Sequence, residues 1–325
     1  MSRSFMRVCL LLSLLVALPY RSPAPLIYRP GEGWTYETPG AHGDWHRARA
    51  KDQLAVAQQA FDQKKYRLAL KASKRVISVW LSDYSPQAQY LIGRCYEELK
   101  MDEYAFNAYQ TLLDKYPKST YAVEVQHRQF LIATRFLGGQ WFKLFGHIPF
   151  FPSMDKTSEM FAKIVRYGPY GDLGPQSQMN IGVAREREKE YPLAVKAYET
   201  AADRYTDQPQ VAADALYKAA QAYTKQARKA EYDQSVAAQA ISAFTDFMAL
   251  HPDDKRVPEA QKVITSLKAE QARGNFRTAQ FYEKLKKWDG ALVYYNEVLS
   301  RSAGTPLANQ ARQRIDILKK RMAAK

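Results

Sequence analysis

The sequence has few cysteines and none of the short motifs that mark common enzymes. Its 325 residues include two cysteines, Cys9 and Cys95. Because Cys9 would leave with a cleaved signal peptide, Cys95 would then stand alone, which excludes a disulfide framework. There is no Gly-x-Ser-x-Gly elbow, Walker loop, dinucleotide glycine pattern or His-Glu-x-x-His zinc pattern. We therefore expect no enzymatic activity, no cofactor and no bound metal.

The principal apolar run is also too short to span a membrane. It extends from Val8 to Leu18, follows Arg3 and Arg7, and is broken by Pro19. A membrane-spanning helix needs roughly 20 apolar residues, whereas a basic start, a short apolar core and a break are typical of a secretory signal peptide. We expect residues 1–24 to be a signal peptide or an N-terminal anchor, and the protein to be exported.

Residues 25–49 differ in composition from the rest of the chain. They are rich in proline, glycine, tyrosine and tryptophan, as in the run from Arg29 to Trp34. This composition predicts an extended, irregular lead-in to the main body. It would serve either as a tether or as a segment that docks Trp34 and Tyr36 onto a partner or onto the repeats.

Alternating β-branched runs are absent after residue 50, and a helical repeat takes their place. In its clearest copy Gly93 lies between Tyr90 and Tyr96, and a polar turn leads to Ala105 and Tyr109. A small residue on the first helix lets a second helix approach, and aromatic side chains fill the space around it. The small residue that opens the second helix recurs at Ala69, Ala105, Thr157, Ala194, Ala240 and Ala291.

This recurrence is similar to the tetratricopeptide repeat (TPR), a helix–turn–helix unit of about 34 residues. One such unit cannot bury its apolar face alone, so units must stack. The sequence therefore predicts an all-α fold, a TPR-like α-solenoid of about five to six helix pairs over residues 50–325. An aromatic insert at residues 138–152 interrupts the third copy.

The first helix of each pair is expected to line a concave groove. A mixed aromatic and charged lining would suit an extended peptide or a partner helix. Each residue could instead be solvated or contact the next repeat. The candidate groove residues are Tyr90, Arg94, Glu97, Glu98, Met179, Val183, Glu186, Arg187, Tyr217 and Gln221.

The insert carries five aromatic residues in one short connection, Trp141, Phe142, Phe145, Phe150 and Phe151. Such a set is unusual for a solvated loop. Either these side chains pack over the inner surface of the superhelix, or they form an exposed apolar patch that contacts a partner or a membrane interface.

Charge of one sign predominates, with 48 Lys and Arg against 33 Asp and Glu and a net charge of +15. The bias is strong in the last predicted helix, from Leu307 onward. Export and the lack of a recognition motif argue against nucleic acid. An anionic lipid or an acidic partner explains the charge better, and plain solubility is the alternative.

The insert and the last repeat also carry a family resemblance. The stretches Gly138–Ser153, Phe161–Val165, Gly168–Pro175 and Ile181-Gly182 resemble the BamD-type outer-membrane assembly proteins. The stretch Arg277–Tyr282 with Trp288–Leu292 is similar to that family's last repeat. The resemblance extends from about Lys51 to Lys319.

The resemblance implies a scaffold in the periplasm, associated with the outer membrane, within the machinery that assembles β-barrels. Its partners would be the barrel-bearing subunit and unfolded barrel proteins. Family members are typically lipoproteins, yet Met6, Arg7 and Val8 before Cys9 do not form a lipobox. The alternative is another envelope TPR adaptor, in Tol-Pal or cell-wall coordination or in secretion, that binds a peptide or protein partner.

Overall fold

The computed structural model describes residues 26–29, 33–36, 45–144, 148–229 and 234–323. The predicted signal peptide or anchor, residues 1–24, lies outside the described residues. The chain divides into two compact units, residues 1–125 and 126–325. Thirteen helices and four short strands make up the described part, so the prediction of an all-α repeat fold is confirmed.

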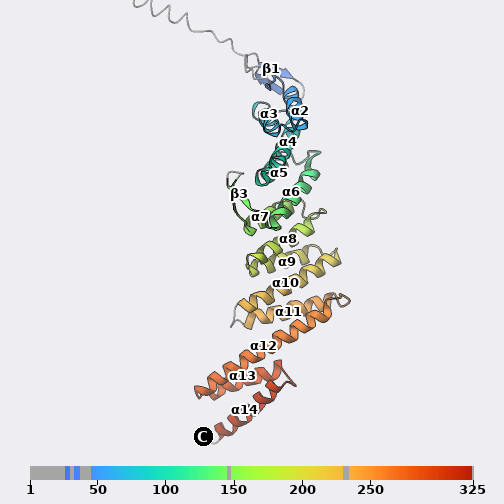
Figure 1. The fold of residues 1–325 in the computed structure, drawn as a ribbon. Coiled ribbons are helices and arrows are strands. Elements are labelled where there is room, and N and C mark those ends of the chain that lie inside the picture. The colour runs from blue at the N-terminus through green and yellow to red at the C-terminus, as the bar shows by residue number, and fades with distance from the viewer. Residues whose placement is uncertain (1–25, 30–32, 37–44, 145–147, 230–233, 324–325) are drawn as a thin grey trace, which may run out of the picture. The chain divides into compact units, whose positions relative to one another are not determined.

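The first unit begins with a strand pair and continues with two helix pairs (Figure 1). Strands β1 (Leu26–Arg29) and β2 (Gly33–Tyr36) are antiparallel, and Tyr28 lies opposite Trp34. The lead-in therefore contains a small sheet that the sequence analysis did not predict. The helices that follow are α2 (Ala50–Asp62), α3 (Tyr66–Val79), α4 (Ser85–Glu98) and α5 (Asp102–Lys115).

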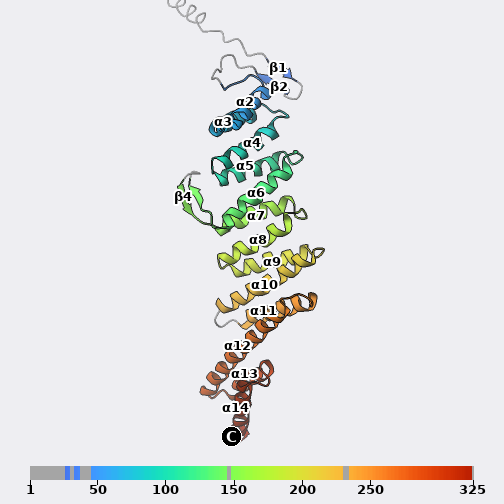
Figure 2. The same ribbon diagram turned by 45° about the vertical axis from the view of Figure 1, so that its right-hand side comes forward.

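Helix α6 (Ala122–Leu137) leads from the first unit into the second. Strands β3 (Phe142–Leu144) and β4 (Ile148–Phe151) form an antiparallel pair between α6 and α7. The helices from there to the C-terminus are α7 (Met154–Tyr167), α8 (Gly174–Arg187), α9 (Tyr191–Arg204), α10 (Pro209–Lys229), α11 (Gln234–Leu250), α12 (Val257–Lys284), α13 (Trp288–Arg301) and α14 (Pro306–Ala323). Within the second unit each helix from α7 onward packs against the next one in chain order (Figure 2).

The six small residues predicted to open second helices all lie on the second helix of a pair. Ala69, Ala105, Thr157, Ala194, Ala240 and Ala291 lie on α3, α5, α7, α9, α11 and α13, and each is completely buried. The described helices therefore form six pairs with α14 as a single last helix. The core is a series of small clusters between successive helices, such as Ala194, Val195, Tyr198, Ala219 and Ala222 between α9 and α10.

Four of the turns within pairs use the same backbone device. A lysine with positive φ follows the first helix at Lys64, Lys100, Lys189 and Lys286. At the second of these turns Lys100 N–H donates to the Glu97 carbonyl and Met101 N–H donates to the Tyr96 carbonyl, at 2.9 Å each. A left-handed residue with these backbone bonds satisfies the carbonyls at a helix end. The chain thus reverses direction in three residues at each of these turns, which brings the second helix back along the first.

Three pairs share one arrangement of residues. A buried amide residue, a small residue and a glutamate follow one another at four-residue steps on the first helix, and the second helix carries a buried tyrosine. Four residues is about one helical turn, so these side chains lie on one face. In two of the pairs the tyrosine hydroxyl donates to the glutamate at 2.9 Å, from Tyr198 to Glu186 and from Tyr295 to Glu283. The sets are Gln89, Gly93, Glu97 and Tyr109; Gln178, Gly182, Glu186 and Tyr198; and Asn275, Ala279, Glu283 and Tyr295.

Candidate protein-binding surfaces

The predicted groove residues of α4 are held in contacts within the first unit. Tyr90 Oη donates to a Glu124 carboxylate oxygen at 2.5 Å, and its ring stacks on Tyr121 with centroids 4.5 Å apart. Arg94 donates to Tyr90 Oη at 3.0 Å and lies over the Phe61 ring at 5.4 Å. These two side chains therefore connect neighbouring helices, which is the inter-repeat alternative.

The two glutamates predicted beside them remain more open. Glu97 is half-buried, and Glu98 is exposed near Tyr66. Burial and the Glu98 charge raise the pKa of Tyr66. Of the four candidates on α4, Glu98 is the one with an exposed side chain.

In the second unit Glu186, one of the predicted groove residues, is engaged within the repeats. Its side chain accepts a hydrogen bond from Tyr198 Oη at 2.9 Å, forms an ion pair with Lys225, and is only 13% exposed. Glu186 lies one turn after Gly182, so it faces the second helix of its own pair and not a groove. Burial and the Glu186 charge raise the pKa of Tyr198.

Tyr217 was also predicted on the groove and instead belongs to the core. It is 5% exposed, its ring lies 5.2 Å from that of Phe247, and the Arg256 guanidinium lies 4.8 Å from its centroid. Gln221, one turn later, is half-buried. The long α10 turns the Tyr217 face towards α11, which the sequence pattern of the shorter copies did not indicate.

The other candidates of the second unit have mixed environments. Met179 and Val183 are half-buried beside the cluster between α9 and α10. Arg187 is exposed, and its guanidinium donates to the Leu137 carbonyl at the end of α6. Binding of a partner by these residues stays a prediction.

The insert divides into an anchored part and an exposed part. Phe142 is buried and stacks on Phe136, with ring centroids 4.2 Å apart. Trp141, Phe150 and Phe151 are 52%, 59% and 38% exposed. Phe142 therefore packs on α6 while the other three side chains are open to solvent. The role of the insert stays a prediction, and Phe145 lies outside the described residues.

Ile148 is also exposed, at 58%, and was not among the residues predicted from the sequence. Counting aromatic residues alone overlooked it, although it occurs in the same strand as Phe150. We name the four exposed apolar residues, Trp141, Ile148, Phe150 and Phe151, the insert patch.

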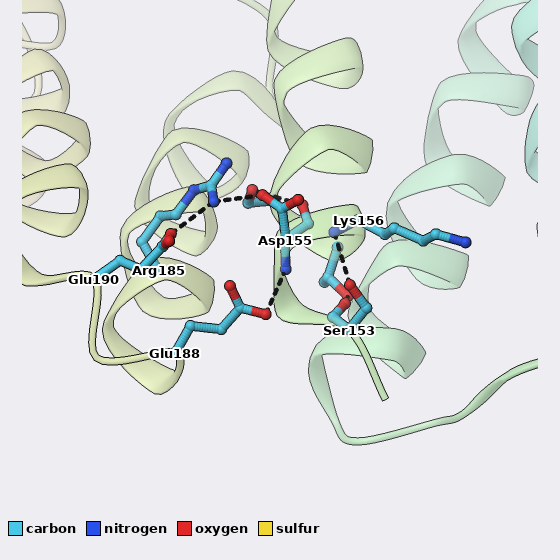
Figure 3. Close-up of polar contacts among 8 residues, drawn as sticks. Ser153, Asp155, Lys156, Arg185, Glu188 and Glu190 are labelled. Atoms are coloured by element: carbon cyan, nitrogen blue, oxygen red, sulfur yellow. Dashed lines mark hydrogen bonds and ion pairs between the residues drawn. The ribbon is translucent and has the colours of Figure 1, made fainter. Parts of the chain in front are cut away.

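A polar cluster holds the point where the insert enters α7 (Figure 3). Ser153 caps the helix, because its Oγ accepts from Lys156 N–H at 3.2 Å. Arg185 contacts Asp155 at 2.5 Å and Glu190 at 2.8 Å, and Glu188 accepts from Asp155 N–H at 2.9 Å. Burial works to lower the pKa of Arg185, and the hydrogen bonds to Glu190 and Asp155 outweigh it, so the pKa is raised. The start of α7 is thereby fastened to the turn between α8 and α9.

The last helix pair exposes a further apolar group that the sequence analysis did not predict. Phe281 and Leu285 are one turn apart at the end of α12, and Val293 lies on α13. Phe281 and Val293 are each 60% exposed. The sequence did contain a signal for this exposed group. Phe281 and Leu285 are four residues apart, on a different face of the helix from the core residue Ala279.

The basic C-terminal helix is partly neutralised by its neighbour. Arg314 of α14 forms an ion pair with Glu283 of α12, and Glu283 also accepts from Tyr295 Oη at 2.9 Å. Burial and Glu283 raise the pKa of Tyr295 to about 12.

Within the described residues no group of three or more His, Cys, Asp or Glu could hold a metal ion. The described helices include none that is both long and apolar enough to cross a membrane.

Paired helices with buried small residues define a class of protein, the tetratricopeptide-repeat proteins. A tetratricopeptide-repeat profile matches residues 87–119, which cover most of α4 and all of α5. The YfiO profile, described as outer membrane lipoprotein, matches residues 153–325, more than half of the chain. The chain therefore belongs to this BamD-type family of outer membrane lipoproteins. The match begins at Ser153, so the insert that carried part of the resemblance lies outside it.

Solved structures of repeat proteins show a distant likeness. The C-terminal part of a TPR repeat-containing protein from Cytophaga hutchinsonii is 14% identical, with 81% of this chain and 87% of that chain covered and a TM-score of 0.33. A TPR protein from Thermus thermophilus is 14% identical, with 66% and 99% covered and a TM-score of 0.30. The TPR2AB domain of yeast Sti1 in its pHSP90 complex is 16% identical, with 83% and 96% covered and a TM-score of 0.31. No curated protein matches the chain.

Proposed function

We propose that this chain is a non-enzymatic scaffold of the outer-membrane β-barrel assembly machinery, located in the periplasm at the outer membrane. Its partners would be the barrel-bearing subunit and unfolded barrel proteins. The observation that carries the proposal is the family match over residues 153–325, which covers all helices from α7 to α14. Membership of an outer membrane lipoprotein family implies association with the cell envelope.

The exposed apolar residues of the last helix pair support a protein contact there. Isolated exposed apolar side chains are ordinary, but neighbouring ones often mark interfaces. Phe281 and Leu285 lie within the matched residues, one helical turn apart. Most of the predicted groove residues are instead engaged within the repeats. We therefore place the main partner contact on the outer face of α12 and α13, with Glu98 and Arg187 as further contacts.

Site-specific crosslinking in intact cell envelopes tests this proposal. A photoreactive phenylalanine analogue would replace Phe281, and in a matched variant it would replace Leu193, an exposed apolar residue on α9. We expect position 281 to crosslink an integral barrel protein and position 193 to do so much less. Depletion of the protein should lower the amounts of folded barrel proteins in the outer membrane.

Two outcomes would contradict the proposal. One is a crosslink from position 281 to a Tol-Pal component, a peptidoglycan enzyme or a secretion protein, with none to a barrel protein. The other is a normal level of folded barrel proteins after depletion.

A further inference from the structure

The insert patch lies on a short strand that is exposed along its whole length. All four residues of β4, Ile148–Phe151, are exposed. Leu144 pairs with Ile148 and Phe142 pairs with Phe151, and a β-bulge leaves Phe150 as an extra residue. Because Phe142 and Leu144 are two residues apart on one strand, their partners Ile148 and Phe151 lie on the same face. The strand pair therefore presents one exposed apolar face, with Phe150 at the bulge beside it.

The patch is presented from a fixed base. Phe142 is buried against Phe136 at one end of the strand pair, and Ser153 caps α7 at the other. Arg185 fastens the first turn of α7 through Asp155. Both views of the fold show β3 and β4 beside the start of α7, directed away from the helices of the second unit (Figures 1 and 2).

Lysines lie beside the patch, and the acidic Asp155 at its base is paired with Arg185. No Asp or Glu occurs between Gly138 and Met154, whereas Lys143 lies in β3. The Lys156 ammonium lies 5.0 Å from the centroid of Phe142 and 5.6 Å from that of Phe151. Lysine beside aromatic rings is the arrangement found where proteins meet the headgroups of a bilayer, because the rings enter the interface and the ammonium meets the phosphates.

We infer that the insert patch is a membrane-interface contact, in which Trp141, Ile148, Phe150 and Phe151 enter the headgroup region of an anionic phospholipid surface. Addition of a partner strand to β4 is disfavoured, because Pro149 lacks the N–H that such a strand would need. The inference goes beyond the proposed function, since it concerns residues before the family match and needs no barrel subunit.

Vesicle binding by the purified full chain tests this inference. The vesicles would contain phosphatidylglycerol and phosphatidylethanolamine, and flotation would measure the bound fraction. The variant with Ile148→Ser, Phe150→Ser and Phe151→Ser should bind at least about tenfold more weakly, because its apolar area no longer enters the interface. A control variant carries Leu81→Ser, Leu193→Ser and Leu250→Ser, which are also exposed, and should bind as the wild type does.

A second measurement distinguishes membrane contact by the insert from membrane contact by the apolar N-terminal segment. Brominated lipids quench the fluorescence of tryptophans that enter the interface, so a part of the quenching should disappear in Trp141→Phe and remain in Trp288→Phe. The inference is overturned if the wild type does not bind anionic vesicles, if the triple-serine variant binds equally well, or if Trp141→Phe leaves the quenching unchanged. Failure of the barrel crosslink at position 281 has no effect on these readouts.

Discussion

Two glycines set the distance between the helices of their pairs. A Cβ atom added at Gly93 would lie 2.1 Å from Tyr109 Cε1, and one added at Gly182 would lie 2.3 Å from Tyr198 Cε1. Both tyrosine rings are completely buried. The glycines are therefore required by close approach of the second helix, and the tyrosine takes the space that a side chain would fill. In the last pair Ala279 occupies the equivalent position below Tyr295.

Replacement of Gly93 by alanine should destabilise the first unit. Alanine favours a helix over glycine by about 1 kcal/mol, but the added methyl group overlaps a buried ring that has no free space to enter. We expect a net loss of about 2 kcal/mol in the free energy of unfolding, measured by denaturant unfolding. Gly171→Ala is the control, because its Cβ would meet only the Gly168 carbonyl oxygen at 3.6 Å. Equal stability of the two variants would refute the close-approach argument.

Asp254 makes stability depend on pH in the acid range. Its carboxylate accepts hydrogen bonds from Arg256 N–H, Nε and Nη2 at 2.8, 2.9 and 2.7 Å, which lowers its pKa from 3.8 to about 2. Because the pKa is lower in the folded state, the stabilisation is fully present above pH 4. It is lost as the pH falls from about 4 to about 2.

Asp254→Asn should remove this pH dependence and about 2 kcal/mol of stability at neutral pH. Thermal unfolding between pH 2 and pH 7 would measure both effects. Asp253→Asn, a change at the exposed neighbouring residue, should leave the wild-type profile unchanged. If Asp254→Asn still lost stability between about pH 4 and pH 2 as the wild type does, another carboxylate would be responsible.

At the scale of elements, the start of α7 depends on residues from another helix pair. Arg185 of α8 holds Asp155, and its remaining partner is Glu190 in the turn before α9. The family match begins at Ser153, at this junction. The matched repeats therefore fix the base of an insert that lies outside the match.

Arg185→Ala should loosen the insert and the first turn of α7 without unfolding the repeats. The substitution leaves Asp155 without its 2.5 Å contact to the guanidinium, and a half-buried pair of this kind contributes about 1 kcal/mol. Hydrogen exchange of the amides from 148 to 160 should become about fivefold faster. Arg166→Ala, at the exposed other end of α7, serves as the control and should leave these amides protected.

The helix pairs could be predicted from the sequence, but the directions in which their side chains point could not. Small residues such as Ala194 and Ala291 recur at helix spacing, and burial requires them to face a partner helix. The groove prediction assigned outward positions by analogy between copies, so it did not indicate that Glu186 and Tyr217 pack within the repeats. The four-residue step from Gly182 to Glu186 already places both on one face. The strand pair of the insert depends on Phe142 packing on Phe136, which no local pattern encodes.

At the scale of the whole molecule, repeat proteins are stabilised mainly by contacts between neighbouring units. The core of this chain consists of separate clusters, for example one around Ala57, Leu91 and Cys95 in the first unit and one around Tyr295 and Leu318 at the C-terminus. These two clusters share no side chains, whereas neighbouring clusters of the second unit share Met179 or Leu216. A local defect should therefore act on its own repeats and fade along the chain.

Hydrogen exchange of Gly93→Ala tests how far a defect extends. We expect amides in α4 and α5 to exchange about 30-fold faster, which corresponds to a local loss of about 2 kcal/mol. Amides in α12, α13 and α14 should keep their wild-type rates, because their cluster contains no residue of the first unit. The matched variant Ala279→Leu, which overfills the last pair, should show the reverse distribution. If exchange rates increased uniformly along the chain in either variant, the repeats would unfold as one cooperative body. The separate clusters would then not be independent units of stability.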